Sequence, residues 1–132
     1  DIDYILKKSD YIVLACPLTP QTYKLIDKEK LNKIQDTSFL INISRGDIVD
    51  EDALISVLKN KKIKGAALDV FSTEPLNKNN PLFSLNNVLL SPHISGNFIG
   101  YQKKVIESFE ENLKRYLKSK SLKNRVCKKR LY

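Results

Sequence analysis

The sequence predicts an α/β fold with a parallel sheet, and three observations lead to this prediction. Short runs of apolar residues recur along the chain. Segments with helical periodicity stand between these runs, and polar turn residues separate the two kinds of segment. Strands that alternate with helices are joined by crossover connections, which make the strands run parallel.

The N-terminal part of the chain supplies two strands and two helices. Residues 2–8 have a helical pattern and lead into residues 11–15, a continuous apolar run that is typical of a buried strand. Asp27 is a candidate helix N-cap, because apolar residues flank it at the spacing of a hydrophobic staple. The next apolar run, residues 39–43, predicts the second strand.

The remaining elements continue this alternation. A helix is predicted from Asp50, because acidic residues fill its positive first turn and lysines crowd its negative end. Strands follow at residues 64–69 and 87–90, with a polar loop between them. The last helix is predicted over residues 97–118. Its apolar stripe consists of Val105, Ile106, Phe109, Leu113 and Leu117.

Polar groups suited to acid–base chemistry follow three of the predicted strands. Arg45 follows the second strand, Glu74 lies past the third, and His93, the only histidine, follows the fourth. The carboxyl ends of parallel strands share one edge of a sheet, and ligands bind at that edge. Histidine is the side chain that normally exchanges a proton near neutral pH. The sequence therefore predicts a reactive site at this edge.

The composition fits one globular domain without a membrane span. The chain has 132 residues, of which 42% are hydrophobic and 29% charged, and no apolar run reaches the length of a membrane helix. The net charge of +8 arises at one end, since residues 112–132 contain nine lysines and arginines and no acidic residue. This end lacks the regularly spaced aromatic residues of single-strand binders, so we favour a solvated tail over nucleic-acid binding.

The cysteines and the first residues of the chain indicate its cellular compartment and whether it is a fragment. Cys16 and Cys127 show neither metal-ligand nor redox spacing, and two unrelated cysteines fit a reducing, cytoplasmic setting. No signal-peptide pattern opens the chain. Because the chain begins with Asp1 in a helical segment, we expect it to be a fragment.

Each candidate residue also has a purely structural interpretation. His93 could be a turn or core histidine, Glu74 a solvated turn carboxylate, and Arg45 a surface residue. The triplet Arg45-Gly46-Asp47 also spells the adhesion tripeptide of extracellular proteins. We interpret that match as chance, because the triplet follows a buried strand.

Four ordered motifs resemble successive motifs of the D-isomer-specific 2-hydroxyacid dehydrogenases. They lie at residues 13–19, 40–51, 65–76 and 92–96. The resemblance extends over essentially the whole chain and implies a parallel Rossmann-type sheet with flanking helices, of which this chain would be the C-terminal portion. Residues 1–118 would belong to the NAD-binding domain, and residues 119–132 would form a basic tail that returns to an absent substrate domain.

The glycine-rich fingerprint of dinucleotide-binding folds is missing from the sequence. The four glycines do not form Gly-x-Gly-x-x-Gly, and by resemblance that loop would precede Asp1. The chain alone is therefore expected to bind dinucleotide weakly at best and to show no dehydrogenase activity. It is also expected to self-associate, because the strand at residues 11–15 would have an unpaired edge.

The resemblance implies an oxidoreductase that reduces 2-keto acids to D-2-hydroxy acids with a hydride from NAD(P)H. Arg45 would bind the substrate carboxylate through its planar fork. His93 would donate the proton during reduction, and Glu74 would hold the imidazole and favour its charged form. A small 2-keto or 2-hydroxy acid is the expected partner, and the full-length form is expected to be a homodimer.

The resemblance also implies cofactor contacts, with NAD expected and NADP left open. These contacts are Cys16 and Pro17 on the adenosine side, Ile43, Ser44 and Arg45 beside the nicotinamide, Asp69 at the carboxamide, and His93 with Gly96 nearby. The alternative is a non-enzymatic, dinucleotide-binding corepressor on the same scaffold. The joint presence of Arg45, Glu74 and His93 favours the enzyme.

Overall fold

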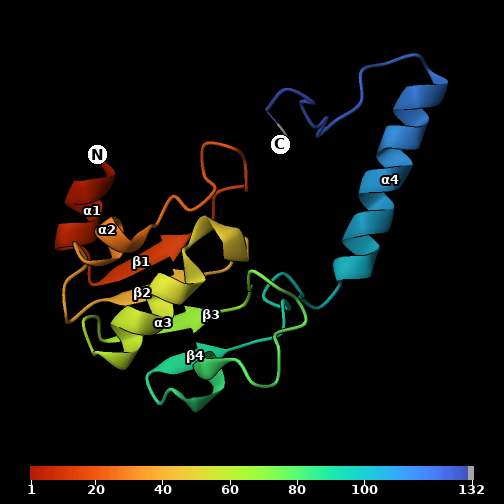
Figure 1. Cartoon of the computed structure of the whole chain (residues 1–132). Helices are drawn as coiled ribbons and strands as arrows, with labels where there is room; N and C mark the ends of the chain where they lie inside the picture. Colours follow the sequence, from red (N-terminus) through yellow and green to blue (C-terminus); the bar gives the residue numbers. More distant parts are fainter. Residues whose placement is uncertain (131–132) are drawn as a thin grey trace. The chain divides into compact units, whose positions relative to one another are not determined.

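The computed structural model of the chain describes residues 1–130 (Figure 1). The chain forms two compact units, Asp1–Ser95 and Gly96–Tyr132. The sequence-based division into residues 1–118 and 119–132 concerns membership of a longer protein and stays a prediction. Residues 131 and 132 of the predicted tail lie outside the described residues.

The first unit is built on a parallel sheet of four strands in the order β1-β2-β3-β4. The strands are β1 (Tyr11–Leu14), β2 (Phe39–Asn42), β3 (Gly65–Leu68) and β4 (Val88–Leu90). All four predicted strands are confirmed, each within the predicted range. Because all the strands run parallel, each connection leaves the carboxyl end of one strand and enters the amino end of the next.

Helices of the first unit begin where side chains can cap their free amides. They are α1 (Ile2–Lys8), α2 (Lys28–Leu31) and α3 (Glu51–Lys59), with short 3₁₀ turns η1 (Gly46–Ile48) and η2 (Pro81–Ser84). Asp27 accepts a hydrogen bond from the Lys30 amide at 2.9 Å, and Asp50 accepts one from the Ala53 amide at 3.2 Å. The predicted N-cap at Asp27 is thus confirmed, and the helix predicted from Asp50 begins there with Asp50 as its N-cap.

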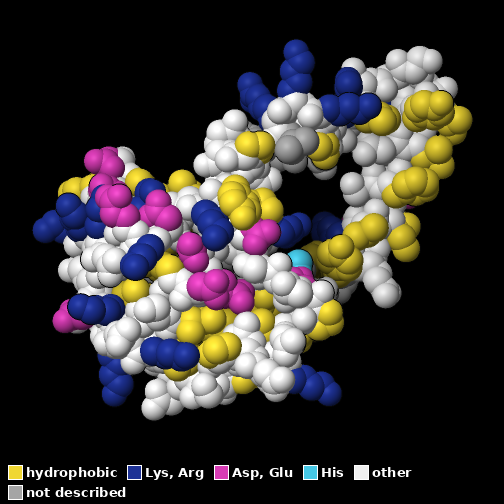
Figure 2. All heavy atoms as spheres, in the orientation of Figure 1, with side chains coloured by type: hydrophobic (Ala, Val, Ile, Leu, Met, Phe, Trp, Pro, Cys, Tyr) yellow, Lys and Arg dark blue, Asp and Glu magenta, His cyan; other side chains and the backbone are white. Residues whose placement is uncertain are grey.

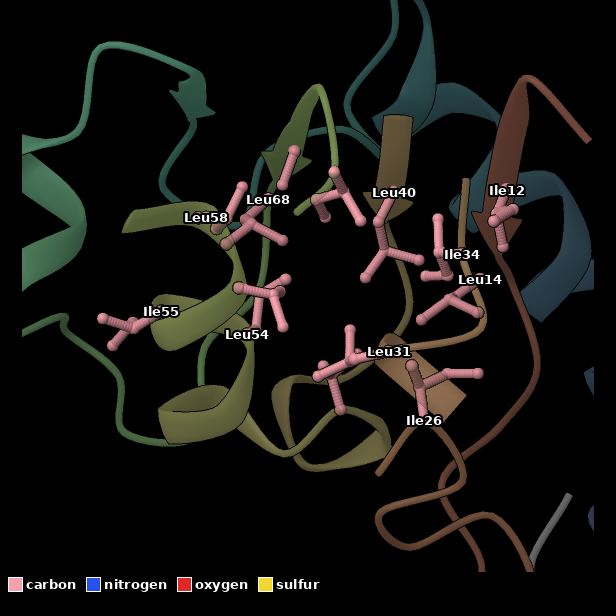
Figure 3. Close-up of a cluster of buried hydrophobic side chains, with 14 of the residues drawn as sticks. Ile12, Leu14, Ile26, Leu31, Ile34, Leu40, Leu54, Ile55, Leu58 and Leu68 are labelled. Atoms are coloured by element: carbon pink, nitrogen blue, oxygen red, sulfur yellow. The ribbon is translucent and has the colours of Figure 1, made fainter. Parts of the chain in front are cut away.

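The core lies between one face of the sheet and these helices (Figure 3). Leu40, in the middle of β2, is fully buried, and Leu54 and Leu58 of α3 point toward it across the interface. The buried apolar side chains of the sheet on this face are Ile12, Leu14, Leu40, Ala66 and Leu68. One layer of helices therefore covers one face of the sheet.

The opposite face of the sheet carries apolar side chains that stay exposed. Along β1 the burial alternates, and Tyr11 and Val13 are exposed while their neighbours are buried. Tyr11 stacks on Phe39 of β2 with ring centroids 5.6 Å apart, and Leu89 of β4 is 71% exposed. The expectation that β1 is buried on both sides is therefore wrong for this chain, because the helices of this unit pack on a single face.

The second unit contains one long helix, α4 (Tyr101–Leu117). It begins four residues later than predicted, because Gly100 adopts a left-handed conformation with φ of +89° and closes the preceding turn. The predicted apolar stripe is present and lies exposed along the helix (Figure 2). The tail turns back after the helix, where the Asn112 side chain exchanges two hydrogen bonds with the backbone of Lys123.

Among the described residues, no helix combines the length and the apolar character that a membrane crossing needs.

We predict that Leu40→Ala lowers the free energy of unfolding by about 2–5 kcal/mol, because it leaves a cavity at the centre of the core. Leu89→Ala removes the same atoms from an exposed position of the same sheet and is the matched control, with an expected effect of about 0.5 kcal/mol or less. Urea denaturation followed by circular dichroism measures both. Equal losses in the two variants would contradict this description of the core.

Candidate active site

The three loops that follow β2, β3 and β4 lie side by side at the carboxyl edge of the sheet. Parallel pairing in the order of the sequence places them there, as the sequence predicted. The loops carry Arg45, Glu74 and His93 respectively. The side chains of Glu74 and His93 are in direct contact, and the Arg45 charge acts on Glu74.

Glu74 and His93 form a hydrogen-bonded pair at the surface of this edge. Nδ1 of His93 lies 2.8 Å from Oε2 of Glu74, and the other carboxylate oxygen accepts the Phe71 amide at 3.0 Å. The hydrogen bonds from His93 and Phe71, and the nearby Arg45 guanidinium, hold the pKa of Glu74 below its usual value.

This pairing determines which imidazole nitrogen is available for chemistry. An ionised carboxylate only accepts hydrogen bonds, so Nδ1 of His93 carries a proton in the pair. The His93 side chain is 46% exposed, and its Nε2 makes no hydrogen bond within the described part of the chain. Nε2 can therefore exchange a proton with an external group.

Arg45 projects from a turn that a buried asparagine holds in shape. Asn42 is 1% exposed; its Nδ2 donates to the Arg45 carbonyl at 2.9 Å, and its Oδ1 accepts the Ser44 amide at 3.1 Å. The Arg45 side chain donates to the Ser44 carbonyl and forms no salt bridge among residues 1–130. Its exposed guanidinium can therefore bind an anion. Sequence reasoning missed Asn42, although a polar residue inside an apolar run was the available signal.

The Arg45 loop and the Glu74 loop are packed backbone against backbone. A Cβ added at Gly46 would stand 1.9 Å from the carbonyl carbon of Phe71, so only glycine fits there. The next helix fastens the same loop, because Glu51 accepts the Ser72 amide at 3.0 Å and the Asn80 side chain at 3.1 Å. The sequence assigned Glu51 only to the positive first turn of a helix and missed this second contact.

Asp69 lies behind the histidine, with both carboxylate oxygens engaged. The side chain is 3% exposed and accepts hydrogen bonds from Ser91, Ile94 and Ser95. Burial raises the pKa of Asp69, but these hydrogen bonds outweigh burial and hold that pKa well below its usual range. The resemblance placed Asp69 at a cofactor carboxamide; in the structure its carboxylate binds the turn that carries His93.

The other residues expected to contact a cofactor form a smaller group at the ends of β1 and β2. The Ser44 hydroxyl donates to the Cys16 carbonyl, which links the two strand ends. Pro17 and Ile43 are exposed, whereas Ser44 is buried. Gly96 is the first residue of the second unit, and its predicted role near a cofactor stays a prediction.

An apolar cavity of about 580 Å³ adjoins the Glu74 loop. Its lining is mostly apolar, with Phe71, Leu76, Phe83, Leu90 and Pro92, and it also includes Glu74. The cavity lies within the first unit, next to the Glu74–His93 pair.

Residues 1–95 match the family described as D-isomer specific 2-hydroxyacid dehydrogenase, NAD binding domain. The chain belongs to this family. It is 46% identical over 118 residues to a glyoxylate reductase of Thermofilum pendens, covering 89% of this chain and 35% of that protein. A glyoxylate reductase of Pyrococcus horikoshii is 46% identical over 112 residues, covering 85% of this chain and 33% of that protein. The chain therefore spans about a third of the length of these relatives.

Solved structures agree with this assignment. A D-isomer specific 2-hydroxyacid dehydrogenase from Xanthobacter autotrophicus, in complex with NADPH and MES, superposes with a TM-score of 0.92 at 35% identity, covering 99% of this chain and 53% of that one. An acyclic imino acid reductase in complex with NADPH and D-Arg gives 0.84 at 37% identity, covering 91% of this chain and 38% of that one. The predicted Rossmann-type parallel sheet is thus confirmed.

We predict that Gly46→Ala destabilises the family domain by about 3 kcal/mol, because the added methyl group forces the Arg45 and Glu74 loops apart. Gly96→Ala is the matched control, since a Cβ there would meet no described atom within 4 Å. Urea denaturation measures the stability of both variants, and NMR chemical shifts of residues 71–74 report the displacement. A Gly46→Ala variant as stable as the control would show that the two loops are not in contact.

Proposed function

We propose that the full-length gene product reduces 2-keto acids to D-2-hydroxy acids with NAD(P)H. The observation that carries the proposal is the 2.8 Å contact between Glu74 and Nδ1 of His93, which leaves Nε2 available at the edge where the exposed Arg45 lies. Membership of the 2-hydroxyacid dehydrogenase family supports it, as do the relatives named glyoxylate reductase. Glyoxylate is accordingly the first substrate to test.

Each catalytic residue has a role that its surroundings fit. Arg45 binds the substrate carboxylate, because its guanidinium is exposed and its planar fork matches two carboxylate oxygens. The reduced nicotinamide, when bound, would supply the hydride that this reduction needs. His93 gives the proton on Nε2 to the carbonyl oxygen, which becomes the hydroxyl, and then regains a proton from water. Glu74 stabilises the charged imidazole through Nδ1.

The chain also carries residues that fit the nicotinamide end of a dinucleotide. Exposed Ile43 offers an apolar surface beside the buried Ser44 and the cation Arg45, at the edge where His93 lies. Cys16 and Pro17 would extend this site from the neighbouring strand. The glycine-rich loop for the pyrophosphate is not among the 132 residues. We propose NAD as the cofactor, with NADP as the alternative to be tested.

The remaining elements of the proposal concern assembly and location. We propose a homodimer of the full-length form, as the resemblance implies. Cys16 and Cys127 are both free thiols, which fits the reducing cytoplasm. The comparisons offer no support for a non-enzymatic corepressor role, and the formed Glu74–His93 pair favours catalysis.

The proposal is tested with the full-length gene product, NADH or NADPH, and a panel of 2-keto acids that includes glyoxylate, hydroxypyruvate and pyruvate. We predict oxidation of the nicotinamide that depends on the keto acid and yields the D-hydroxy acid. His93→Gln should lower kcat by about 10²–10⁴-fold, because it removes the proton donor. Its affinity for the cofactor, measured by fluorescence titration, should change little. Wild-type protein that is inactive on the whole panel, or a fully active His93→Gln variant, would contradict the assignment.

The pH dependence tests Glu74 separately. Loss of the negative charge in Glu74→Gln removes the partner that stabilises the protonated imidazole, and reduction needs that proton. The pH above which reduction slows should therefore fall, while activity at lower pH is partly retained. Glu107→Gln, an exposed change of the same kind on α4, is the control and should leave the pH–rate profile unchanged. Superimposable profiles of wild type and Glu74→Gln would remove Glu74 from this role.

A further inference from the structure

His93 has a backbone conformation that a residue with a Cβ rarely adopts. Its φ is +54°, in the left-handed region, and it directly follows Pro92 at the end of β4. Left-handed non-glycine residues persist only where the surroundings hold them, and they gather at functional sites. Some interaction of the turn must therefore keep His93 in this state.

That interaction comes from Asp69, at the end of the neighbouring strand. Its main-chain oxygen accepts the His93 amide at 2.8 Å. One carboxylate oxygen accepts the Ser91 hydroxyl and, at 2.9 Å, the Ile94 amide, and the other accepts the Ser95 amide at 2.9 Å. Four hydrogen bonds from the histidine turn thus converge on one residue.

The geometry has the character of an anion site filled by a side chain of the protein. Consecutive amides that follow a left-handed residue point into one concavity, and such concavities bind anions. Here the amides are those of Ile94 and Ser95, and the anion is the Asp69 carboxylate. Asp69 is 3% exposed, so water does not compete for these bonds and the low dielectric strengthens them.

The negative charge of Asp69 is essential to this arrangement. A carboxylate accepts at both oxygens, whereas an asparagine amide accepts at one atom and donates at the other. In Asp69→Asn, one of the two backbone amides would face a donor, and a buried N–H would lose its partner. The hydrogen bonds from the turn also favour the ionised carboxylate, which keeps it charged over the whole working range of pH.

We propose that Asp69 is a positioning residue, whose carboxylate holds the left-handed backbone of His93 and so directs the imidazole to Glu74. The role is exerted through the turn at residues 91–95 and is distinct from a direct contact with a cofactor. It deepens the proposed reductase function and rests on it for its effect on turnover. The proposed effect of Asp69 on the conformation of the turn rests only on the hydrogen bonds described above.

The decisive experiment compares Asp69→Asn with wild type in the full-length gene product. We expect kcat at saturating cofactor to fall by about 100-fold, as the proton donor is misplaced. The dissociation constant of NADH or NADPH, measured by fluorescence titration, should change by about threefold or less. Hydrogen exchange of the Ile94 and Ser95 amides should accelerate, while exchange in β2 stays slow.

If Asp69→Asn fails to fold, a milder variant and a control variant still test the proposal. Ser91→Ala removes a single hydrogen bond to the carboxylate and leaves both amide contacts, so kcat should fall by about fivefold with faster exchange at Ile94. Asp47→Asn makes the same acid-to-amide change at the same edge of the sheet, and its side chain makes no hydrogen bond among the described residues. It should match wild type in every measurement.

The measurements distinguish the positioning role from a direct cofactor contact. If Asp69→Asn weakens cofactor binding more than tenfold but leaves kcat and amide exchange at wild-type values, Asp69 is a cofactor contact and the positioning role is overturned. Unchanged exchange and turnover in Ser91→Ala overturn it as well. If wild type is inactive on every keto acid, the proposed function fails. The exchange of Ile94 and Ser95 in Asp69→Asn then still decides whether Asp69 holds the turn.

Discussion

Parallel pairing of strands that are consecutive in the sequence is the constraint on which the rest of this structure depends. In such a sheet every crossover starts at the carboxyl edge, so the residues just after β2, β3 and β4 must be neighbours. The register places Asn42 opposite Leu68, and Leu68 opposite Leu90. The turns that carry Arg45, Glu74 and His93 therefore begin at the same height along the strands. Only a few residues separate each strand end from its candidate catalytic residue.

Two buried polar residues fix the conformation of the turns at this edge. Asn42 and Asp69 are both nearly inaccessible, and each forms hydrogen bonds with the backbone of a turn that carries a candidate catalytic side chain. Among the described residues, no buried side-chain nitrogen or oxygen lacks a hydrogen-bond partner. A buried polar group without a partner destabilises a fold, so these contacts also select one conformation for each turn.

Sequence reasoning succeeded where the physical rule is local. The N-cap at Asp27, the helix start at Asp50 and the four strands follow from spacing and side-chain type, and the structure confirms them. The start of α4 was wrong, because nothing in the composition of residues 97–100 reveals that Gly100 closes a left-handed turn. The contacts of Gly46 with Phe71 and of Glu51 with Ser72 join residues more than twenty positions apart. These contacts depend on how the loops pack in three dimensions, and no local pattern in the sequence reveals that packing.

The approach of Gly46 to Phe71 also bears on how this half of the site moves. With backbone packed on backbone and Glu51 fastened to Ser72, the Arg45 and Glu74 loops have no room to shift independently. A displacement of one loop would therefore have to carry the other with it, because close-packed atoms transmit a shift to their neighbours. A ligand that binds Arg45 and the Glu74–His93 pair meets two loops whose backbones are already packed against each other. Its association loses little conformational entropy on this side of the site.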